Sequence, residues 1–170
     1  MRTKARTRHP RGFTLVECVC SITIIAVTAA IVMPTIDSAA TGYVNASKAR
    51  DVSEGTAYAL DRCVAVLRDT PPSTTSGMMD ITTATSTSVQ FADKRGLSLV
   101  GTTLNLIGTD GASVPLLRNV TSFSIAYLDQ DGKTSVLATP GKTWRYNITI
   151  VASGFELRGG AFIRARLLGT

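Results

Sequence analysis

The sequence predicts an α+β protein in which one long N-terminal helix packs on an antiparallel β-sheet. Three observations support this fold class. An apolar segment at 13–36 is followed by an amphipathic helical pattern that runs to Asp69. A Ser/Thr-rich stretch at 70–88 then interrupts the pattern. Beyond it, apolar residues alternate with period two between glycine-containing turns, as in short antiparallel strands.

The positive charge of the chain is concentrated at its N-terminus. The 170 residues carry a formal net charge of +6, and residues 13–170 hold 13 basic and 12 acidic side chains. We therefore interpret residues 1–12 as a basic leader peptide. The nearly neutral remainder has no basic groove with interleaved aromatic residues, so we expect no nucleic-acid partner. The five basic residues of the leader are Arg2, Lys4, Arg6, Arg8 and Arg11.

The cysteine and histidine counts exclude several kinds of chemistry. The only cysteines are Cys18, Cys20 and Cys63, and the only histidine is His9, inside the leader. A zinc site and a histidine-based catalytic arrangement are therefore not expected. No phosphate-binding loop or nucleophile–base pair is visible, so we predict a protein that is not an enzyme and has no cofactor. We expect Cys18 and Cys20 to be small packing residues and Cys63 to be buried.

The segment 13–36 has the length and composition of a membrane-spanning helix. Glu17 is its only charged residue, and Cys18 to Ile36 would extend about 28 Å as a helix, close to the thickness of a bilayer's hydrocarbon core. The basic leader on one flank and Asp37 on the other predict a cytoplasmic N-terminus and an extracytoplasmic remainder.

Three kinds of N-terminal segment compete for this pattern. A secretory signal peptide would be cleaved near Ser38–Ala40, but its apolar core would be short and uncharged. A plain signal anchor leaves Glu17 unexplained, because an unpaired carboxylate in a membrane costs about 2.5–3.5 kcal/mol. The third kind gives Glu17 a partner.

Residues 11–17, with the sequence RGFTLVE, resemble the class III signal of type IV prepilins and pseudopilins. The resemblance implies that prepilin peptidase, which is also an N-methyltransferase, cleaves after Gly12 and methylates Phe13. It implies that Glu17 neutralises the amine of Phe13 on a neighbouring subunit and sets the axial register of a filament. Pro34 matches a proline that many family members carry, where it kinks the helix.

This resemblance implies a pilin-like fold and a structural role in a type IV pilus-like or type II secretion filament. The implied location is the bacterial inner membrane, crossed once, and the implied partners are other pilin-like subunits and the inner-membrane assembly platform. Residues 120–129, Gly132 and Trp144 look like the J-type minor pseudopilin of type II secretion, a protein-transport system, although Pro140 replaces the usual proline-rich approach to the last strand. The alternative is a signal-anchored or secreted extracytoplasmic ligand-binding domain or enzyme.

After the membrane segment, residues 37–69 predict an amphipathic continuation of the helix. Gly42 and Gly55 are weak points where the helix could be interrupted, and Pro71–Pro72 ends it. We expect residues 70–88 to form a loop with one short strand around 78–82. The expected apolar face of the helix consists of Val52, Thr56, Leu60, Cys63, Val64 and Leu67.

Residues 89–170 predict a β-rich globular exported domain. The turn at 129–132 has the alternating oxygen ligands that begin a calcium loop, which makes Asp129 and Asp131 metal candidates. No glutamate follows at the twelfth position of such a loop, so we interpret the segment as a hairpin turn with no metal. We expect strands at 88–92, 97–100, 103–107, 114–117, 120–128, 134–138, 144–152 and 162–168.

Overall fold

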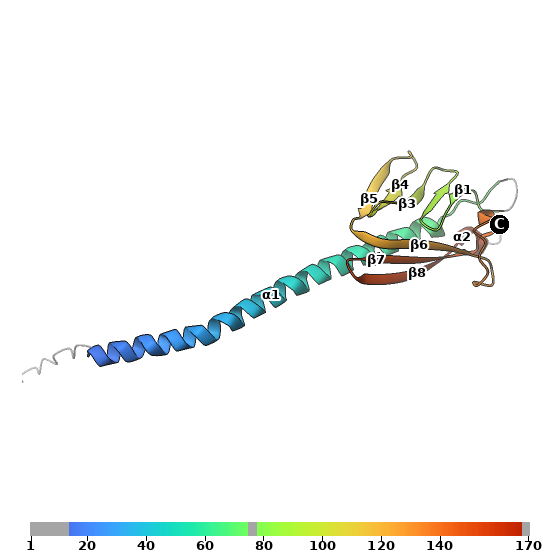
Figure 1. Cartoon of the computed structure of the whole chain (residues 1–170). Helices are drawn as coiled ribbons and strands as arrows, with labels where there is room; N and C mark the ends of the chain where they lie inside the picture. Colours follow the sequence, from blue (N-terminus) through green and yellow to red (C-terminus); the bar gives the residue numbers. More distant parts are fainter. Residues whose placement is uncertain (1–13, 75–77, 168–170) are drawn as a thin grey trace, which may run out of the picture. The chain divides into compact units, whose positions relative to one another are not determined.

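The computed structural model describes residues 14–74 and 78–167 of the chain. It contains one long helix, α1 (Leu15–Arg68), followed by strands and two short helical segments, η1 (Pro140–Lys142) and α2 (Arg164–Leu167) (Figure 1). The chain divides into two compact units, residues 1–47 and 48–170, which are described separately. The strands are β1 (Ile81–Ala84), β2 (Ser88–Phe91), β3 (Gly96–Val100), β4 (Thr103–Ile107), β5 (Ser113–Leu117), β6 (Val120–Leu128), β7 (Arg145–Ala152) and β8 (Phe155–Phe162).

The part of α1 in the second unit buries one face. Thr56, Ala59, Cys63 and Leu67 are buried, and their spacing of three and four places them on one side of the helix. The predicted apolar face is therefore confirmed, with Ala59 added to it. Gly42 and Gly55, the weak points of the predicted helix, do not interrupt it, because α1 runs unbroken through both; a glycine in a helix costs only about 1 kcal/mol relative to alanine.

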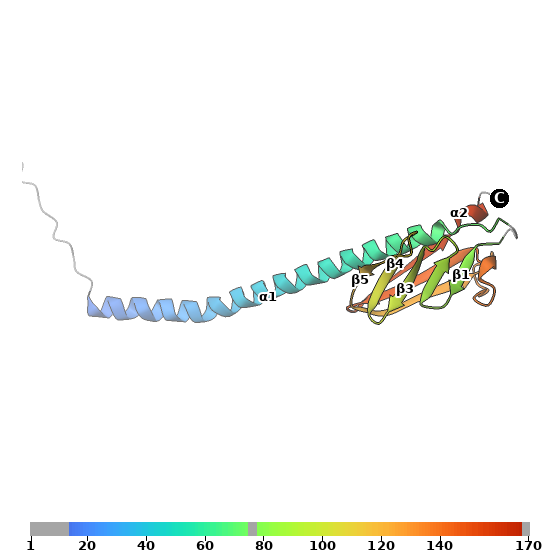
Figure 2. The ribbon, with the colours of Figure 1, turned by 90° about the horizontal axis from the view of Figure 1, so that it is seen from above.

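The strands form two antiparallel sheets where the sequence suggested one. The first sheet has the order β1-β2-β3-β4-β5, and Figure 2 shows β1, β3, β4 and β5 side by side. The second has the order β6-β7-β8 (Figure 1). The chain changes sheets after β5, at Asn119, whose φ of 57° marks a sharp turn, and β6 then pairs with β7. A main-chain hydrogen bond of 2.7 Å from Ile125 to Ser86 links the two sheets. The predicted α+β architecture, a long helix on antiparallel β-structure, is confirmed.

A single hydrophobic core joins the helix to both sheets. Cys63 of α1, Phe91 of β2 and Ile148 of β7 all belong to it. Tyr127 and Tyr146 meet edge to face at its centre, with ring centroids 5.5 Å apart. Their hydroxyl groups still find partners: Tyr127 donates to the Ser88 carbonyl at 2.9 Å, and the Tyr146 hydroxyl lies 3.2 Å from that of Thr70. Because both sheets depend on this core, residues 48–167 fold around one interior.

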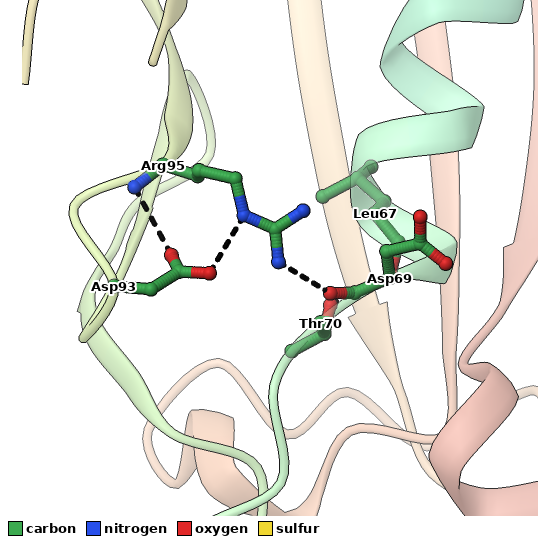
Figure 3. Close-up of polar contacts among 5 residues, drawn as sticks. All are labelled: Leu67, Asp69, Thr70, Asp93 and Arg95. Carbon is green, nitrogen blue, oxygen red and sulfur yellow. Dashed lines mark hydrogen bonds and ion pairs between the residues drawn. The ribbon is translucent and has the colours of Figure 1, made fainter. Parts of the chain in front are cut away.

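A charged contact fixes the C-terminal end of α1 (Figure 3). The guanidinium of Arg95 pairs with Asp93 at 2.6 Å and donates a hydrogen bond of 2.9 Å to the Asp69 carbonyl. The last carbonyls of a helix have no partner within the helix, so this side chain satisfies a group that would otherwise need water. The contact ties the helix end to the turn between β2 and β3.

Two expected strands are wrong. Residues 134–138 form only an isolated bridge between Ser135 and Leu128, because the Asp131 carboxylate accepts hydrogen bonds from the main chain of Lys133 and Thr134 and extends the turn. Of the strand expected at 162–168, residues 163–167 are not strand: β8 ends at Phe162 and α2 follows, while residue 168 lies outside the described residues.

The last strand, β8, lies earlier in the chain than expected. A two-residue connection at Ser153 and Gly154, with φ of 48° and 86°, returns the chain directly after β7. The Ser-Gly pair was the available sequence signal, and Gly159-Gly160 obscured the strand that follows it. The other expected strands are confirmed with small shifts of their ends. The short strand expected around 78–82 corresponds to β1, which lies slightly later, at Ile81–Ala84.

Candidate processing and assembly segment

The described part of the chain begins just after the predicted cleavage site. Gly12 and Phe13 lie outside the described residues, and α1 starts one residue after Thr14. The Glu17 carboxylate accepts hydrogen bonds of 3.0 Å from both the main-chain N–H and the hydroxyl of Thr14. In return, the Thr14 hydroxyl accepts a bond of 3.3 Å from the Glu17 N–H. This reciprocal pair is a capping box, which satisfies free N–H groups at a helix start.

The capping box gives Glu17 a role within its own subunit that sequence reasoning missed. The signal was present, because Thr-x-x-Glu before an apolar run is the sequence pattern of a capping box. Both bonds to Thr14 reach Oε2, and Oε1 has no hydrogen bond among the described residues. The Glu17 side chain is exposed. The structure thus holds an oriented carboxylate at the start of α1, with one oxygen that no described residue binds.

The first half of α1 exposes an apolar surface all round. In the most apolar 18-residue window of the helix no residue is buried, and its length and composition are sufficient to cross a membrane. Such a surface needs lipid or other helices to cover it. Its large exposed side chains are Leu15, Val16, Val19, Ile22, Ile24, Ile25, Val27, Ile31, Val32, Met33 and Ile36.

The hydroxyl groups of this segment bond to their own helix. Ser21, Thr23 and Thr28 each donate a bond of 2.8 Å to the carbonyl four residues earlier. Thr35 donates to the carbonyl of Val32 at 2.6 Å. Such internal bonds remove the need for water and so lower the cost of placing a hydroxyl in hydrocarbon.

Pro34 lies inside α1 without ending it. Its ring nitrogen has no proton to donate to the carbonyl of Ala30, so one rung of the helical ladder is missing there. The helix nevertheless continues to Arg68. The kink expected at Pro34 stays a prediction.

Asp129 and Asp131 serve the turn between β6 and the following loop. Asp131 accepts hydrogen bonds from the Thr134 hydroxyl and from the main chain of Lys133 and Thr134, and these bonds lower the pKa of its carboxyl group. Gly132, with φ of 68°, completes the turn. Within residues 14–74 and 78–167, no cluster of three or more Asp, Glu, Cys or His side chains could hold a metal ion.

The three cysteines lie in two different environments. Cys18 and Cys20 are exposed on the apolar half of α1, and all three thiols are free. Cys63 is buried in the core, as expected, and burial raises the pKa of its thiol to about 12. The Cys63 thiol is therefore protonated at neutral pH and acts as a packing group.

Comparison with known proteins identifies the N-terminal segment. A family model described as the prokaryotic N-terminal methylation motif matches residues 7–33. A comparison of the chain with curated proteins gives no match. The matched residues include Gly12, Phe13, the capping box and most of the apolar half of α1, so the resemblance inferred from residues 11–17 is confirmed. Residues 7–33 therefore carry the N-terminal methylation motif, the class III signal that type IV pilin-like proteins have and that prepilin peptidase recognises.

Proposed function

We propose that the mature chain is a non-enzymatic structural subunit of a type IV pilus-like or type II secretion filament, cleaved after Gly12 and assembled through the first half of α1. The observation that carries this proposal is the coincidence of two features in one segment. The methylation motif at 7–33 runs directly into a helix with an apolar surface that no other described residue of its own chain covers. A membrane anchor needs such a surface for lipid, and a filament subunit needs it again for neighbouring helices.

We propose that Glu17 sets the register between subunits. Cleavage after Gly12 would create a positive amine on Phe13, which is covalently next to Thr14. The capping box holds the Glu17 carboxylate at this end of the helix and leaves Oε1 without a hydrogen bond to any residue of the described part of the chain. Two opposite charges that are each costly in lipid would gain most by pairing, so the Phe13 amine of a neighbouring subunit is the natural partner.

The proposed orientation follows from the charges on the two sides of the apolar segment. The basic leader would stay in the cytoplasm, while residues 48–170 would lie outside the inner membrane. Prepilin peptidase and the assembly platform would meet the chain in that membrane. Filament assembly would then withdraw the helix from lipid into contact with other pilin-like subunits.

Within this family we propose a minor, tip-located subunit of the J type. The proposal rests on the resemblance of residues 120–129, Gly132 and Trp144 to that pseudopilin. These residues correspond to β6, its turn and the residue before β7, where the Trp144 N–H donates a bond of 2.9 Å to Leu128. Copy number would test it: a tip subunit is expected at a small fraction of the abundance of the major subunit.

Mass spectrometry of the protein isolated from its own cells tests the processing. We expect the mature chain to begin at methylated Phe13. Gly12→Val should stay full-length, because a side chain at this position obstructs cleavage, while Gly12→Ala serves as the smallest perturbation. An unchanged mature mass in Gly12→Val would reject the cleavage. A soluble product that begins after Ala40 would instead establish a secreted domain.

A further inference from the structure

The three-stranded sheet has a polar outer face. Tyr146, Ile148 and Ile150 of β7 point into the core, so Arg145 and Asn147 lie on the opposite side of the strand. Arg145 and Phe162 are cross-strand partners, as are Asn147 and Gly160. The outer face is defined here by the side of β7 and β8 that carries Arg145, Asn147, Arg158, Gly160 and Phe162.

Arg145 is held flat across β8 on this face. Its guanidinium carbon lies 5.0 Å from the centre of the Phe162 ring, a cation–π contact. A Cβ on Gly160 would lie 3.2 Å from Nη2 and 3.4 Å from Nε of Arg145, so the glycine leaves the space that the side chain occupies. The guanidinium of Arg145 makes no hydrogen bond or ion pair with any described residue. The result is a positioned cation without a counter-ion among residues 14–74 and 78–167.

Two buried polar atoms on this face, one of them in Arg145 itself, lack hydrogen-bond partners within the described residues. Arg145 Nε and Asn147 Oδ1 are both inaccessible to water and unbonded within the described residues. Such atoms are rare in folded proteins. A hollow of about 360 Å³ lies against Arg145, Asn147, Arg158 and Gly160.

The neighbouring charges are already paired or used elsewhere. Arg158 pairs with Glu156 at 2.7 Å, and the Asp131 carboxylate is bound within its own turn. Among the described residues that line the hollow, Arg145 is thus the charge without a counter-ion, which favours an acidic ligand.

The edge of β8 is also open. β8 is the outermost strand of its sheet (Figure 1), and most of its residues are exposed. Apart from its ladder with β7, its main chain makes no hydrogen bond with a described residue. An eight-residue strand with a free edge can pair with an added strand from another chain.

We propose that the free edge of β8, together with Arg145, binds an extended acidic segment of a neighbouring filament subunit. This inference rests on the proposed function for the identity of the partner. The segment would pair with the main chain of β8, and one Asp or Glu carboxylate would accept hydrogen bonds from the Arg145 guanidinium. This contact lies in the exported unit and is separate from the Glu17 contact in the membrane.

A peptide titration of the full-length protein in detergent micelles tests this site. The probes are acetyl-Thr-Val-Glu-Val-Thr-amide and the same peptide with Gln in place of Glu. NMR would follow the amide signals of residues 155–162 and the Nε–H signal of Arg145. We expect the Glu peptide to shift both sets of signals and to bind about tenfold more tightly than the Gln peptide.

Variants separate the charge from the fold. Arg145→Gln and Gly160→Ala should each weaken binding of the Glu peptide. The first variant removes the positive charge, and the second places a methyl group against the Arg145 guanidinium and displaces it. Arg118→Gln, at an exposed arginine between β5 and β6, should bind like wild type. Absence of peptide binding, equal binding of the two peptides, or shifts confined to β5 would overturn the inference. The start of the mature chain at Phe13 does not depend on Arg145, so failure here is distinct from failure of the proposed function.

Discussion

The guanidinium of Arg95 donates a hydrogen bond of 2.9 Å to the main-chain oxygen of Asp69, the residue that follows the end of α1 (Figure 3). Arg95 is itself held by Asp93, which accepts from both its Nε at 2.6 Å and its main-chain N–H at 3.1 Å. The Asp69 side chain lies 3.7 Å from Arg164, just after β8. The end of the helix is therefore attached both to the turn between β2 and β3 and to the first residue of α2.

Replacement of Arg95 should destabilise residues 48–170. Its side chain is only 28% exposed, so the paired charges are partly shielded from water. We expect Arg95→Ala to lower the free energy of unfolding by about 1–2 kcal/mol, the range for hydrogen bonds that involve a charged group. Urea unfolding of the full chain in detergent, followed by Trp144 fluorescence, would measure the change. Arg118→Ala is the control, and an equal loss in both variants would contradict the assigned contact.

Two glycines should respond to alanine in opposite directions. A Cβ on Gly96 would lie 2.2 Å from the carbonyl oxygen of Val89, a backbone atom that cannot move aside cheaply. A Cβ on Gly55 in α1 would meet nothing closer than 4.0 Å. We expect Gly96→Ala to destabilise the fold by at least about 2 kcal/mol. Gly55→Ala should stabilise it by about 0.5–1 kcal/mol, the difference in helix propensity.

The same urea measurement would compare these variants. Stabilisation by Gly96→Ala would show that β2 and β3 are farther apart than the structure has them. Destabilisation by Gly55→Ala would show that the helix packs more closely at this point.

Local patterns were sufficient to predict α1 and most strands. The apolar run, the spacing of Thr56, Cys63 and Leu67, and the alternation in β6 and β7 each reflect burial along a single element. What the sequence did not reveal depends on contacts between distant elements. The division into two sheets depends on which strand pairs with β6, and Gly159-Gly160 in β8 appear as a turn until Leu60 and Arg145 are seen to occupy their space.

The residues of the candidate site also differ in whether the sequence could predict them. Gly12, Phe13 and Glu17 were predicted from a contiguous motif, whereas the capping role of Thr14 needed attention to a second pattern in the same residues. Arg145 carried no sequence signal, because its significance comes from Phe162 and Gly160 on another strand. Arg95 likewise donates a hydrogen bond to the carbonyl of Asp69, which lies 26 residues earlier in the chain.

We expect the folded state to lose stability in alkaline solution, because its core buries ionisable side chains. Burial raises the pKa of Cys63 from 9.0 to about 12 and also raises the pKa values of Tyr127 and Tyr146 above their ordinary 10.0. The neutral forms are favoured by folding, so this stabilisation is complete below about pH 9 and is lost as pH rises toward the folded-state values. Each group can contribute a slope of at most about 1.4 kcal/mol per pH unit.

The Cys63→Ala variant isolates the thiol from the two tyrosines. Unfolding in urea at several pH values between 8 and 11.5 would measure the stability of both proteins. We expect the stability advantage of wild type over Cys63→Ala to be constant below pH 9 and to shrink above it. An advantage that stays constant to pH 11 would contradict the burial of Cys63.

Glu17 combines a capping role and a charge, and three variants can separate them. Glu17→Ala removes both, and we expect it to insert into the membrane normally, because it removes the only charge of the apolar segment, but to assemble poorly. Glu17→Gln keeps a side chain that can complete the capping box while losing the charge. Thr14→Val removes the hydroxyl of the box and keeps the charge.

If the Glu17 charge sets the register, Glu17→Gln should assemble as poorly as Glu17→Ala, whereas Thr14→Val should assemble nearly as well as wild type. If capping is what matters, the order reverses, because loss of the N-cap costs a helix about 1 kcal/mol and Gln at 17 largely preserves the box. The ratio of each variant in sheared filaments to that in the membrane fraction decides between the two. Normal incorporation of Glu17→Gln would eliminate the charge pair with Phe13, and it would leave the capping box as the reason for a glutamate at this position.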